Sequence, residues 1–373
     1  MPNLVHCSTG NGRTGMFIAL WNLMDETLET NSPRVSATVE AMRNYRQGMV
    51  ETEDQYMFIS RAASIACWPL LRPLSIKAFK RIELNSSYFY NLFESLATIS
   101  ENFNMENDLS FQEENLPKNR YSGPFYAESY LAHIFSFIPP EGNTYINAAF
   151  VDNHYTKGGM IATQAPLPNT INDFWALVLD QQVTQIVILN KNQKVIADAP
   201  NYWPKNGEKG QYGNVEVYAK HVIKAIKLRE FSLTQKSHTN SLDSDSTGVT
   251  VSQWHLRSWP EVQSVPNNID EFIQILERVL HHSRANCGKR TLVHCEDGCF
   301  KTGLFIACFN ILQGLEESKY IHISSVILII RETQKHFIAD VEQLRFCFEV
   351  VRRFTQKSKK NPLAGLPFNG NNQ

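Results

Sequence analysis

The sequence of 373 residues has no run of apolar residues approaching the length of about 18 that a transmembrane helix needs. It also lacks a charge excess of either sign, since Lys plus Arg number 36, Asp plus Glu number 37, and the formal net charge is −1. This balance argues against a general nucleic-acid binder and against a polybasic membrane-surface protein. We therefore expect no nucleic-acid partner and no membrane segment in this chain.

Cysteine is scarce and irregularly spaced, with seven residues and no Cys-x-x-Cys pair. That pattern suggests neither a zinc ribbon nor a disulfide framework, and a reducing, cytosolic setting fits it best. The sequence does have material for a sizeable core, because 43% of its residues are hydrophobic and only 20% are charged. At about 150 residues per domain, the length predicts about two and a half domains.

An internal repeat organises the chain. Residues 5–15 match residues 293–303 at an offset of 288, and the same register holds without a gap to the pair Gln55 and Gln343. An offset of this size is typical of whole domains rather than of solenoid repeats. More than 200 residues precede the Cys of the second copy, whereas six precede that of the first. We therefore expect the chain to be a fragment that begins inside its first domain.

The predicted domain organisation follows from this repeat and from composition. Residues 1–67 form the last part of a first domain, and residues 68–75, which contain two prolines, form a linker. Residues 76–356 form a complete second domain. The polar, Pro/Gly/Asn-rich residues 357–373 are expected to be disordered.

Local patterns predict a mixture of helices and strands. Short buried strands are expected at residues 4–7 and 291–295, each leading through a Gly-rich loop to a helix, at 15–28 and 303–315. Two or three helices are expected within 76–115, a further one opens at Thr170 with a capping-box-like pattern, and another begins near 269 with Asn267 or Asn268 as N-cap. Further strands are expected at 143–151, 159–163, 186–189, 228–233 and 249–254, with a long polar hairpin tip at 234–248. This mixture predicts an α/β or α+β domain.

The first Cys loop has the pattern of a phosphate site. Cys7 ends a predicted strand and Arg13 stands at a helix N-terminus, where inward backbone N–H groups and the helix dipole attract an anion. The same field lowers a thiol pKa, so Cys7 is a candidate nucleophile, Arg13 a bidentate phosphate binder and Thr14 a donor to the departing sulfur. The intervening loop residues are Ser8, Thr9, Gly10, Asn11 and Gly12.

Plainer interpretations stand beside this one. Cys7 alone could be a small buried residue in a glycine turn, but the whole motif favours a phosphate loop. His6 is expected to form hydrogen bonds in the core beneath the loop rather than to act as a base or a metal ligand. In the second copy, a redox pair of Cys295 and Cys299 is conceivable, and two unreacted thiols are the simpler alternative.

At this point the sequence resembles a receptor-type protein-tyrosine phosphatase with tandem cytoplasmic phosphatase domains. Besides the Cys loop, the resemblance is carried by six segments: Lys118-Asn119-Arg120-Tyr121, Tyr145-Ile146-Asn147-Ala148, Thr163-Gln164-Ala165-Pro166-Leu167, Asp173-Phe174-Trp175, Tyr202-Trp203-Pro204 and Trp259-Pro260-Glu261. It implies a highly twisted mixed central sheet flanked by helices. It also implies hydrolysis of phosphotyrosine in proteins through a phosphocysteine intermediate, without a metal or other cofactor.

The resemblance further implies roles for residues of the first copy. Cys7 corresponds to the nucleophile, Arg13 to the phosphate binder and Gln55 to a glutamine that orients the hydrolytic water, while Glu51 replaces a second glutamine. The general acid and the tyrosine-recognition loop of this copy would lie before Met1, so we expect the chain as given to be inactive. Its parent is expected to be a single-pass plasma-membrane receptor of which this chain is a cytoplasmic portion, with phosphotyrosine proteins as partners.

The second copy departs from the family pattern within its loop. Lys301 stands in place of the arginine, and a point charge cannot reproduce a planar two-pronged clamp. Glu296 and Asp297 add negative charge that repels phosphate and raises the pKa of the Cys295 thiol. Phe300 replaces a small glycine and is expected to fill or distort the loop.

Outside the loop, Glu261 stands where the family has an aspartic acid, which shifts the donated proton by about a bond length. Ala339 and Asp340 replace a Gln-Thr pair although Gln343 remains. Tyr121, which would stack on the substrate ring, is kept, while Gly123 replaces an aspartate. These losses predict a regulatory pseudophosphatase that contacts the first domain.

Two functions from different classes remain open for the chain. One is the C-terminal part of an active tandem phosphatase, and the alternative is a non-catalytic phosphoprotein-binding or scaffolding module. A dual-specificity or lipid phosphatase is disfavoured, because Tyr121 implies a deep slot for an aromatic ring.

Overall fold

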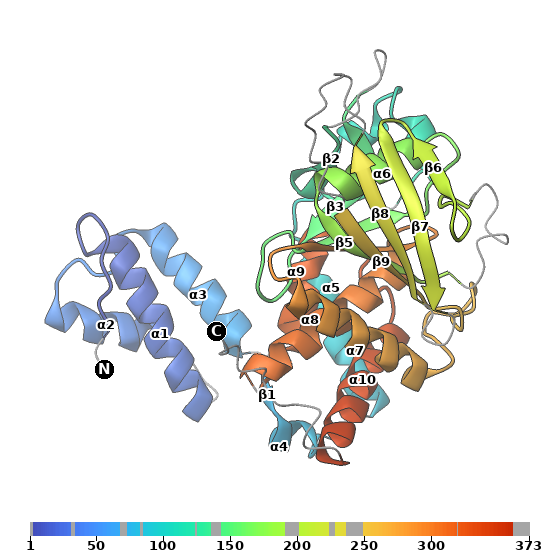
Figure 1. Ribbon diagram of the computed structural model, residues 1–373. Helices are drawn as coiled ribbons and strands as arrows, with labels where there is room; N and C mark the ends of the chain where they lie inside the picture. Colours follow the sequence, from blue (N-terminus) through green and yellow to red (C-terminus); the bar gives the residue numbers. More distant parts are fainter. Residues whose placement is uncertain are drawn as a thin grey trace, which may run out of the picture. The chain divides into compact units, whose positions relative to one another are not determined.

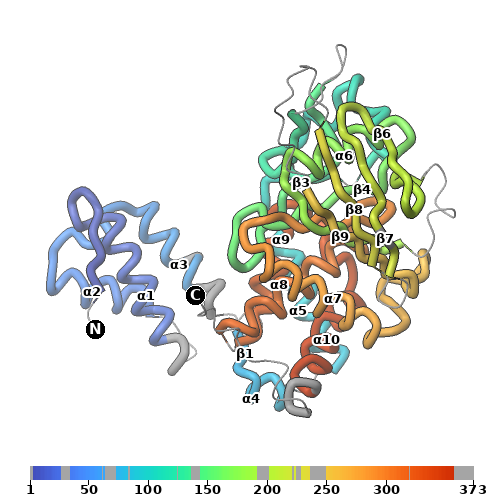
Figure 2. The backbone as a smooth tube through the Cα atoms, viewed as in Figure 1, coloured from blue at the N-terminus to red at the C-terminus, as the bar shows by residue number. Residues whose placement is uncertain are grey.

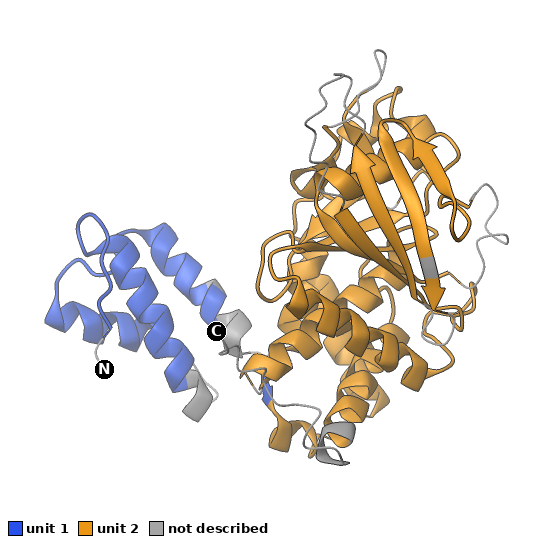
Figure 3. Cartoon of the chain, in the orientation of Figure 1, with its two compact units in different colours: residues 1–74 blue, residues 75–373 orange. Residues whose placement is uncertain are grey.

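The computed structural model describes residues 3–30, 34–67, 73–82, 85–123, 125–135, 143–190, 201–223, 228–235, 249–318 and 320–360 (Figure 1). The chain divides into two compact units, residues 1–74 and residues 75–373 (Figure 3). None of the described helices is both long enough and apolar enough to cross a membrane.

Unit 1 is built from three helices, α1 (Gly12–Thr30), α2 (Val35–Tyr45) and α3 (Glu53–Cys67). They share a small core made of Ala19, Leu23, Val39, Met42, Val50, Ile59 and Ala63. The strand predicted at residues 4–7 is absent, since residues 3–7 have no regular structure and Leu4 is 92% exposed. The prediction failed because an extended segment becomes a strand only when a neighbouring strand pairs with it.

Unit 2 contains the larger part of the fold. Its helices are α4 (Ile76–Phe79), α5 (Ser86–Ser100), α6 (Ile171–Asp180), α7 (Ile269–Ala285), α8 (Phe300–Ser318), α9 (Ile323–Thr333) and α10 (Val341–Lys360), with short 3₁₀ turns η2 (Leu109–Phe111), η3 (Leu116–Lys118) and η4 (Glu128–Tyr130). Its main strands are β2 (Leu131–His133), β3 (Tyr145–Val151), β4 (Met160–Gln164), β5 (Val183–Ile188), β6 (Lys209–Tyr212), β7 (Val215–Ile223), β8 (Leu228–Gln235), β9 (Val249–His255) and β10 (Arg290–Cys295). The short strands β1 (Leu74–Ser75) and β11 (Tyr320–Ile321) lie outside the main sheet.

The main sheet has nine strands in the order β2-β3-β4-β10-β5-β9-β8-β7-β6. Strand β10 runs parallel to both of its neighbours, β4 and β5, while the outer strands pair antiparallel. Figure 2 shows α5, α7, α8, α9 and α10 gathered together, with α6 apart from them beside the strands. Because β10 is central and parallel, the loop after Cys295 emerges at the carboxyl edge of the sheet, where α/β folds place their ligands.

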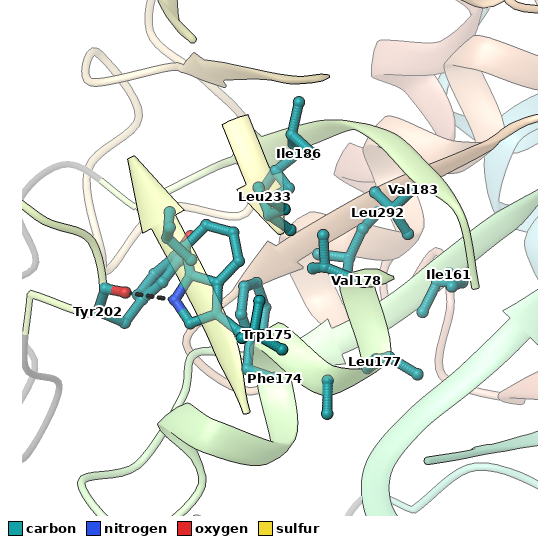
Figure 4. Packing of buried hydrophobic residues seen from close by; sticks show 14 of the residues in the cluster. Ile161, Phe174, Trp175, Leu177, Val178, Val183, Ile186, Tyr202, Leu233 and Leu292 are labelled. Atoms are coloured by element: carbon teal, nitrogen blue, oxygen red, sulfur yellow. Dashed lines mark hydrogen bonds between the residues drawn. The ribbon is translucent and has the colours of Figure 1, made fainter. Parts of the chain in front are cut away.

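Packing fixes this arrangement on both sides of the sheet. Trp175 of α6 is fully buried and donates its indole N–H to the carbonyl of Tyr202 at 2.6 Å, with Phe174 beside them (Figure 4). The first sixteen residues of α8 are buried except Phe300, so this helix is enclosed as its all-round apolar sequence predicts. At the start of α7, Asn268 accepts a hydrogen bond from the Glu271 backbone N–H at 3.0 Å, which confirms one of its two predicted caps.

The mixed sheet with flanking helices confirms the predicted α+β class. The predicted capping box at Thr170 is wrong, because this side chain makes no capping bond and instead accepts the Leu167 N–H at 2.9 Å. The predicted tail is wrong for residues 357–360, which continue α10. The rest of that tail (361–373), residues 68–72 of the linker and residues 236–248 of the hairpin tip lie outside the described residues.

Candidate active-site loops

In unit 1 the Cys7 sulfur is held by two donors. The Gly10 backbone N–H lies 3.2 Å and the Thr14 hydroxyl 3.1 Å from Sγ. Gly10 has φ of +73°, a left-handed conformation that glycine adopts without strain. The Thr14 hydrogen bonds lower the pKa of Cys7 to about 6, the Gly10 and Thr9 backbone N–H groups also lower it, and partial burial opposes them. A thiol with this pKa is largely ionised at neutral pH, as a nucleophile requires.

Gln55 lies against the same loop. A Cβ added to the buried Gly12 would come within 2.7 Å of the Gln55 Nε2 and 3.2 Å of the Glu51 Oε2, so glycine makes room for both side chains. The Glu51 backbone N–H fixes Gln55 by donating to its Oε1 at 2.8 Å. Arg13 occupies the first turn of α1 with its side chain exposed. The structure therefore brings Cys7, Thr14 and Gln55 to one loop.

In unit 2 the corresponding thiol is buried, and a carboxylate bonds to it. Thr302 donates to the Cys295 Sγ at 3.1 Å, and Cys295 donates to the Asp297 Oδ1 at 3.0 Å. The same Asp297 oxygen accepts the backbone N–H groups of Cys299 at 2.8 Å and Phe300 at 3.3 Å. Burial, followed by the negative charge of Asp297, raises the pKa of Cys295. The loop N–H groups that would face a phosphate are thus bonded to the chain's own carboxylate.

The cation of this loop is also paired. Lys301 Nζ lies 2.7 Å from the Glu261 Oε2 and 5.6 Å from the ring centre of Trp259. The side chains of Lys301 and Glu261 are only 9% and 24% exposed, so the pair is shielded from solvent. Glu261, at the position of the acid, and Lys301, at the position of the phosphate-binding arginine, therefore form an ion pair with each other.

Two further sequence-predicted residues join the second loop. Tyr121, about half exposed, donates its hydroxyl to the Glu296 carboxylate. Gln343 donates to the backbone carbonyls of Ser264 at 3.1 Å and Phe300 at 3.2 Å. Phe300 was expected to fill or distort the loop. Its side chain is 42% exposed, so it does not fill the loop, and distortion stays a prediction.

The repeat in sequence is also a repeat in geometry. Arg43 donates to the carbonyls of Met49 and Val50, and Arg331, at the offset of 288, donates to those of Phe337 and Ile338. Val50 and Ile338 both have φ of +59°, which is rare for a β-branched residue. Gln55 and Gln343 both accept the backbone N–H four residues earlier, at 2.8 and 2.9 Å. The two sites therefore share one backbone design and differ in their side chains.

A protein-family model described as protein-tyrosine phosphatase matches residues 1–64 and 115–353. The chain belongs to the protein-tyrosine phosphatase family. Similar known proteins include receptor-type tyrosine-protein phosphatase epsilon from rat, 28% identical over 95% of this chain and 52% of that protein, and from human, 28% identical over 95% and 51%. Receptor-type tyrosine-protein phosphatase S from chicken is 29% identical over 95% of this chain and 24% of that protein. The chain spans about half the length of the epsilon relatives.

These matches confirm the resemblance to receptor-type phosphatases. Sequence reasoning nevertheless missed features of the phosphatase loops. The hydrogen bonds of Asp297 within the second loop were not predicted, and neither were those of Arg46 to the first loop. The repeat does carry a signal for Asp297, because this residue stands at the position of Thr9. His6 was expected in the core and is exposed, whereas His294 is buried and lies 2.7 Å from the Tyr202 hydroxyl.

Proposed function

We propose that this chain is the cytoplasmic portion of a receptor-type protein-tyrosine phosphatase in which the Cys7 loop carries the chemistry and unit 2 is a regulatory pseudophosphatase. The observation that carries the proposal is the contrast between the thiols: the partly exposed Cys7 sulfur accepts the Gly10 N–H and the Thr14 hydroxyl, whereas the buried Cys295 donates to the Asp297 carboxylate. The receptor-type names of the relatives support the placement at a plasma membrane.

The reaction assigned to the first loop is a two-step transfer. The Cys7 thiolate attacks phosphorus, the bond to the tyrosine oxygen breaks, and that oxygen takes a proton from water, leaving phosphocysteine. Water oriented by Gln55 then attacks phosphorus, releasing inorganic phosphate and the thiolate, to which Thr14 donates its hydroxyl. Arg13 holds the phosphoryl oxygens in both steps. Residues 1–74 contain no Asn-Arg-Tyr loop, and their Trp68-Pro69 pair is followed by Leu70 rather than by an acidic residue, so efficient turnover needs groups beyond this unit.

Unit 2 is assigned a regulatory role because three features oppose catalysis at once. Asp297 bonds the loop N–H groups, Lys301 is paired with Glu261, and the Cys295 thiol is buried and protonated at neutral pH. A carboxylate on the loop N–H groups also disfavours the alternative that this loop binds phosphoproteins through their phosphate.

Carboxymethylation of the full chain by iodoacetate tests the proposal, with each cysteine followed by peptide mass spectrometry. At pH 6.5 we expect Cys7 to react at least about tenfold faster than Cys287, an exposed free thiol that serves as the internal control. Inorganic phosphate should slow the reaction at Cys7 and leave Cys287 unchanged, and Cys295 should remain unmodified. A Cys7 that reacts like Cys287 without phosphate protection would remove the assigned nucleophile.

The assignment of unit 2 has a separate test. Residual hydrolysis of a phosphotyrosine peptide by the full chain should be lost in Cys7→Ser and unaffected by Cys295→Ser. Turnover that persists in Cys7→Ser and disappears in Cys295→Ser would contradict the pseudophosphatase assignment.

A further inference from the structure

Arg46 lies along the outer edge of the first loop. It follows α2 as its C-terminal cap, and its guanidinium donates from Nε to the Asn11 Oδ1 at 2.8 Å and from Nη2 to the Thr9 carbonyl at 2.9 Å. A Cβ added to Gly10 would come within 3.4 Å of both terminal nitrogens, so the guanidinium also lies against the turn that carries the Gly10 N–H. One planar side chain thus contacts three successive loop residues.

The counterpart of Arg46 in unit 2 is Gln334, which has the same backbone conformation but different side-chain contacts. Arg46 has φ −147° and ψ 112°, and Gln334, at the offset of 288, has φ −153° and ψ 108° after α9. Gln334 is buried and donates to the carbonyl of Phe125, a residue outside the loop sequence. There Asp297 bonds the loop N–H groups from the inside. The first loop is therefore held from outside by Arg46, and the second loop is held from inside by Asp297.

We propose that Arg46 is a positioning residue for the Cys7 loop: it holds Thr9, Gly10 and Asn11 so that the Gly10 N–H points at the Cys7 sulfur and the inner face of the loop is left to the phosphate. The proposal rests on the proposed function of Cys7. The planar guanidinium of Arg46 is suited to holding the loop, because two of its nitrogens donate to two acceptors of the loop in one fixed geometry. Arg46 is exposed, so its replacement leaves the core of unit 1 intact.

Other charged groups also surround this loop and set the background of any pH experiment. They are His6 and Arg13 on the loop and at the start of α1, and Glu51 before α3, whose Oε2 lies 3.2 Å from a Cβ added to Gly12. All three remain in the variants below, so a change in the titration of Cys7 reports on Arg46.

The experiment measures the rate of Cys7 alkylation by neutral iodoacetamide in the full chain between pH 4.5 and 9, with peptide mass spectrometry as the readout. We expect Arg46→Ala to raise the apparent pKa of Cys7 by about one unit, so that alkylation at pH 5.5 slows by about tenfold. Arg46→Lys keeps the charge but cannot span both acceptors, and we expect it to behave like Arg46→Ala. Arg34→Ala removes another exposed arginine of unit 1, bonded to Glu26 rather than to the loop, and should leave the profile unchanged.

The outcomes separate the two proposals. A Cys7 that titrates like an ordinary thiol in the unaltered chain contradicts the proposed function itself. A low pKa that survives in Arg46→Ala overturns the positioning role alone. A full return to the unaltered profile in Arg46→Lys would show that charge matters and the two-pronged contact does not, which also overturns it.

Discussion

The two Cys loops of this chain share a backbone and differ in the state of the thiol. Gly10 and Gly298 have φ of +73° and +74°, and a threonine hydroxyl lies 3.1 Å from the sulfur in each loop. The difference comes first from the burial of Cys295 and then from the position of Thr9, which is Asp297 in the second copy. In the second loop the Asp297 carboxylate accepts the N–H groups of Cys299 and Phe300, so the chain's own anion takes these donors. Phosphate chemistry therefore depends on what the loop leaves unbonded as much as on the nucleophile.

The helices that follow the loops differ in a second way. In α8, Phe305, Phe309 and Leu312 are fully buried, and Phe272 of α7 packs on Phe305 with ring centres 5.7 Å apart. Their counterparts in α1 are Phe17, Trp21 and Met24, which are 50–57% exposed. The same apolar stripe therefore supports a core in unit 2 and contributes little to folding stability in unit 1.

The largest expected effect sharpens this contrast between the helices. Phe309→Ala should lower the free energy of unfolding of unit 2 by about 3–5 kcal/mol, because it leaves a cavity in a fully buried helix. Trp21→Ala, the matched change in α1, should cost less than about 1 kcal/mol. Denaturant unfolding of the full chain, with hydrogen exchange to assign each transition to its unit, measures both. Equal costs would show that the two stripes have the same surroundings.

Removal of the Asp297 charge tests the contrast between the loops. Asp297→Asn should lower the pKa of Cys295 by about one to three units, because the carboxylate raises it and the amide does not. Burial, the larger cause, remains, so the pKa of Cys295 should stay above the ordinary value of a thiol. The pH profile of alkylation at Cys295 provides the measurement, and an unchanged profile would leave burial as the sole cause.

The Lys301–Glu261 ion pair should contribute more to the free energy of unfolding than an exposed pair does. Glu261→Gln leaves a nearly buried ammonium with a weaker acceptor, and we expect a loss of about 1–3 kcal/mol in the stability of unit 2. Glu26→Gln breaks the Arg34 pair of unit 1, where Arg34 is 71% and Glu26 is 15% exposed, and should cost less because solvent around Arg34 screens the pair. Thermal unfolding of both variants decides whether burial sets this difference.

The smallest effect concerns the threonines next to the sulfurs. Thr14→Val removes the largest cause of the lowered pKa of Cys7, so we expect that pKa to rise by about one unit from about 6 and the thiolate fraction at pH 6 to fall several-fold. Thr302→Val should leave Cys295 unreactive at the same pH, because its thiol is already protonated. Alkylation rates at pH 6 compare the two. A Thr14→Val chain as reactive as the unaltered chain would show that the hydroxyl does not stabilise the thiolate.

Much of the fold could be read from local patterns. The β-branched run of β5, the enclosed apolar helix α8 and the Asn268 cap all follow from short-range chemistry that the sequence displays. The segment before Cys7 could not be read in this way, because a strand is defined by its partners. The site was partly predictable for the same reason: Lys301 and Glu261 were identified as altered, but their pairing joins residues 40 apart in the chain.

The sequence by itself determined the repeat, the phosphatase family and the residues at each position of the two loops. Only the tertiary structure decided that Asp297 turns inward to the loop N–H groups, that Arg46 reaches the first loop from outside, and that Cys295 is buried while Cys7 is partly exposed. The physical reason is that identity and spacing fix what a side chain can donate or accept. Its pKa and its partner depend on which distant segments pack around it.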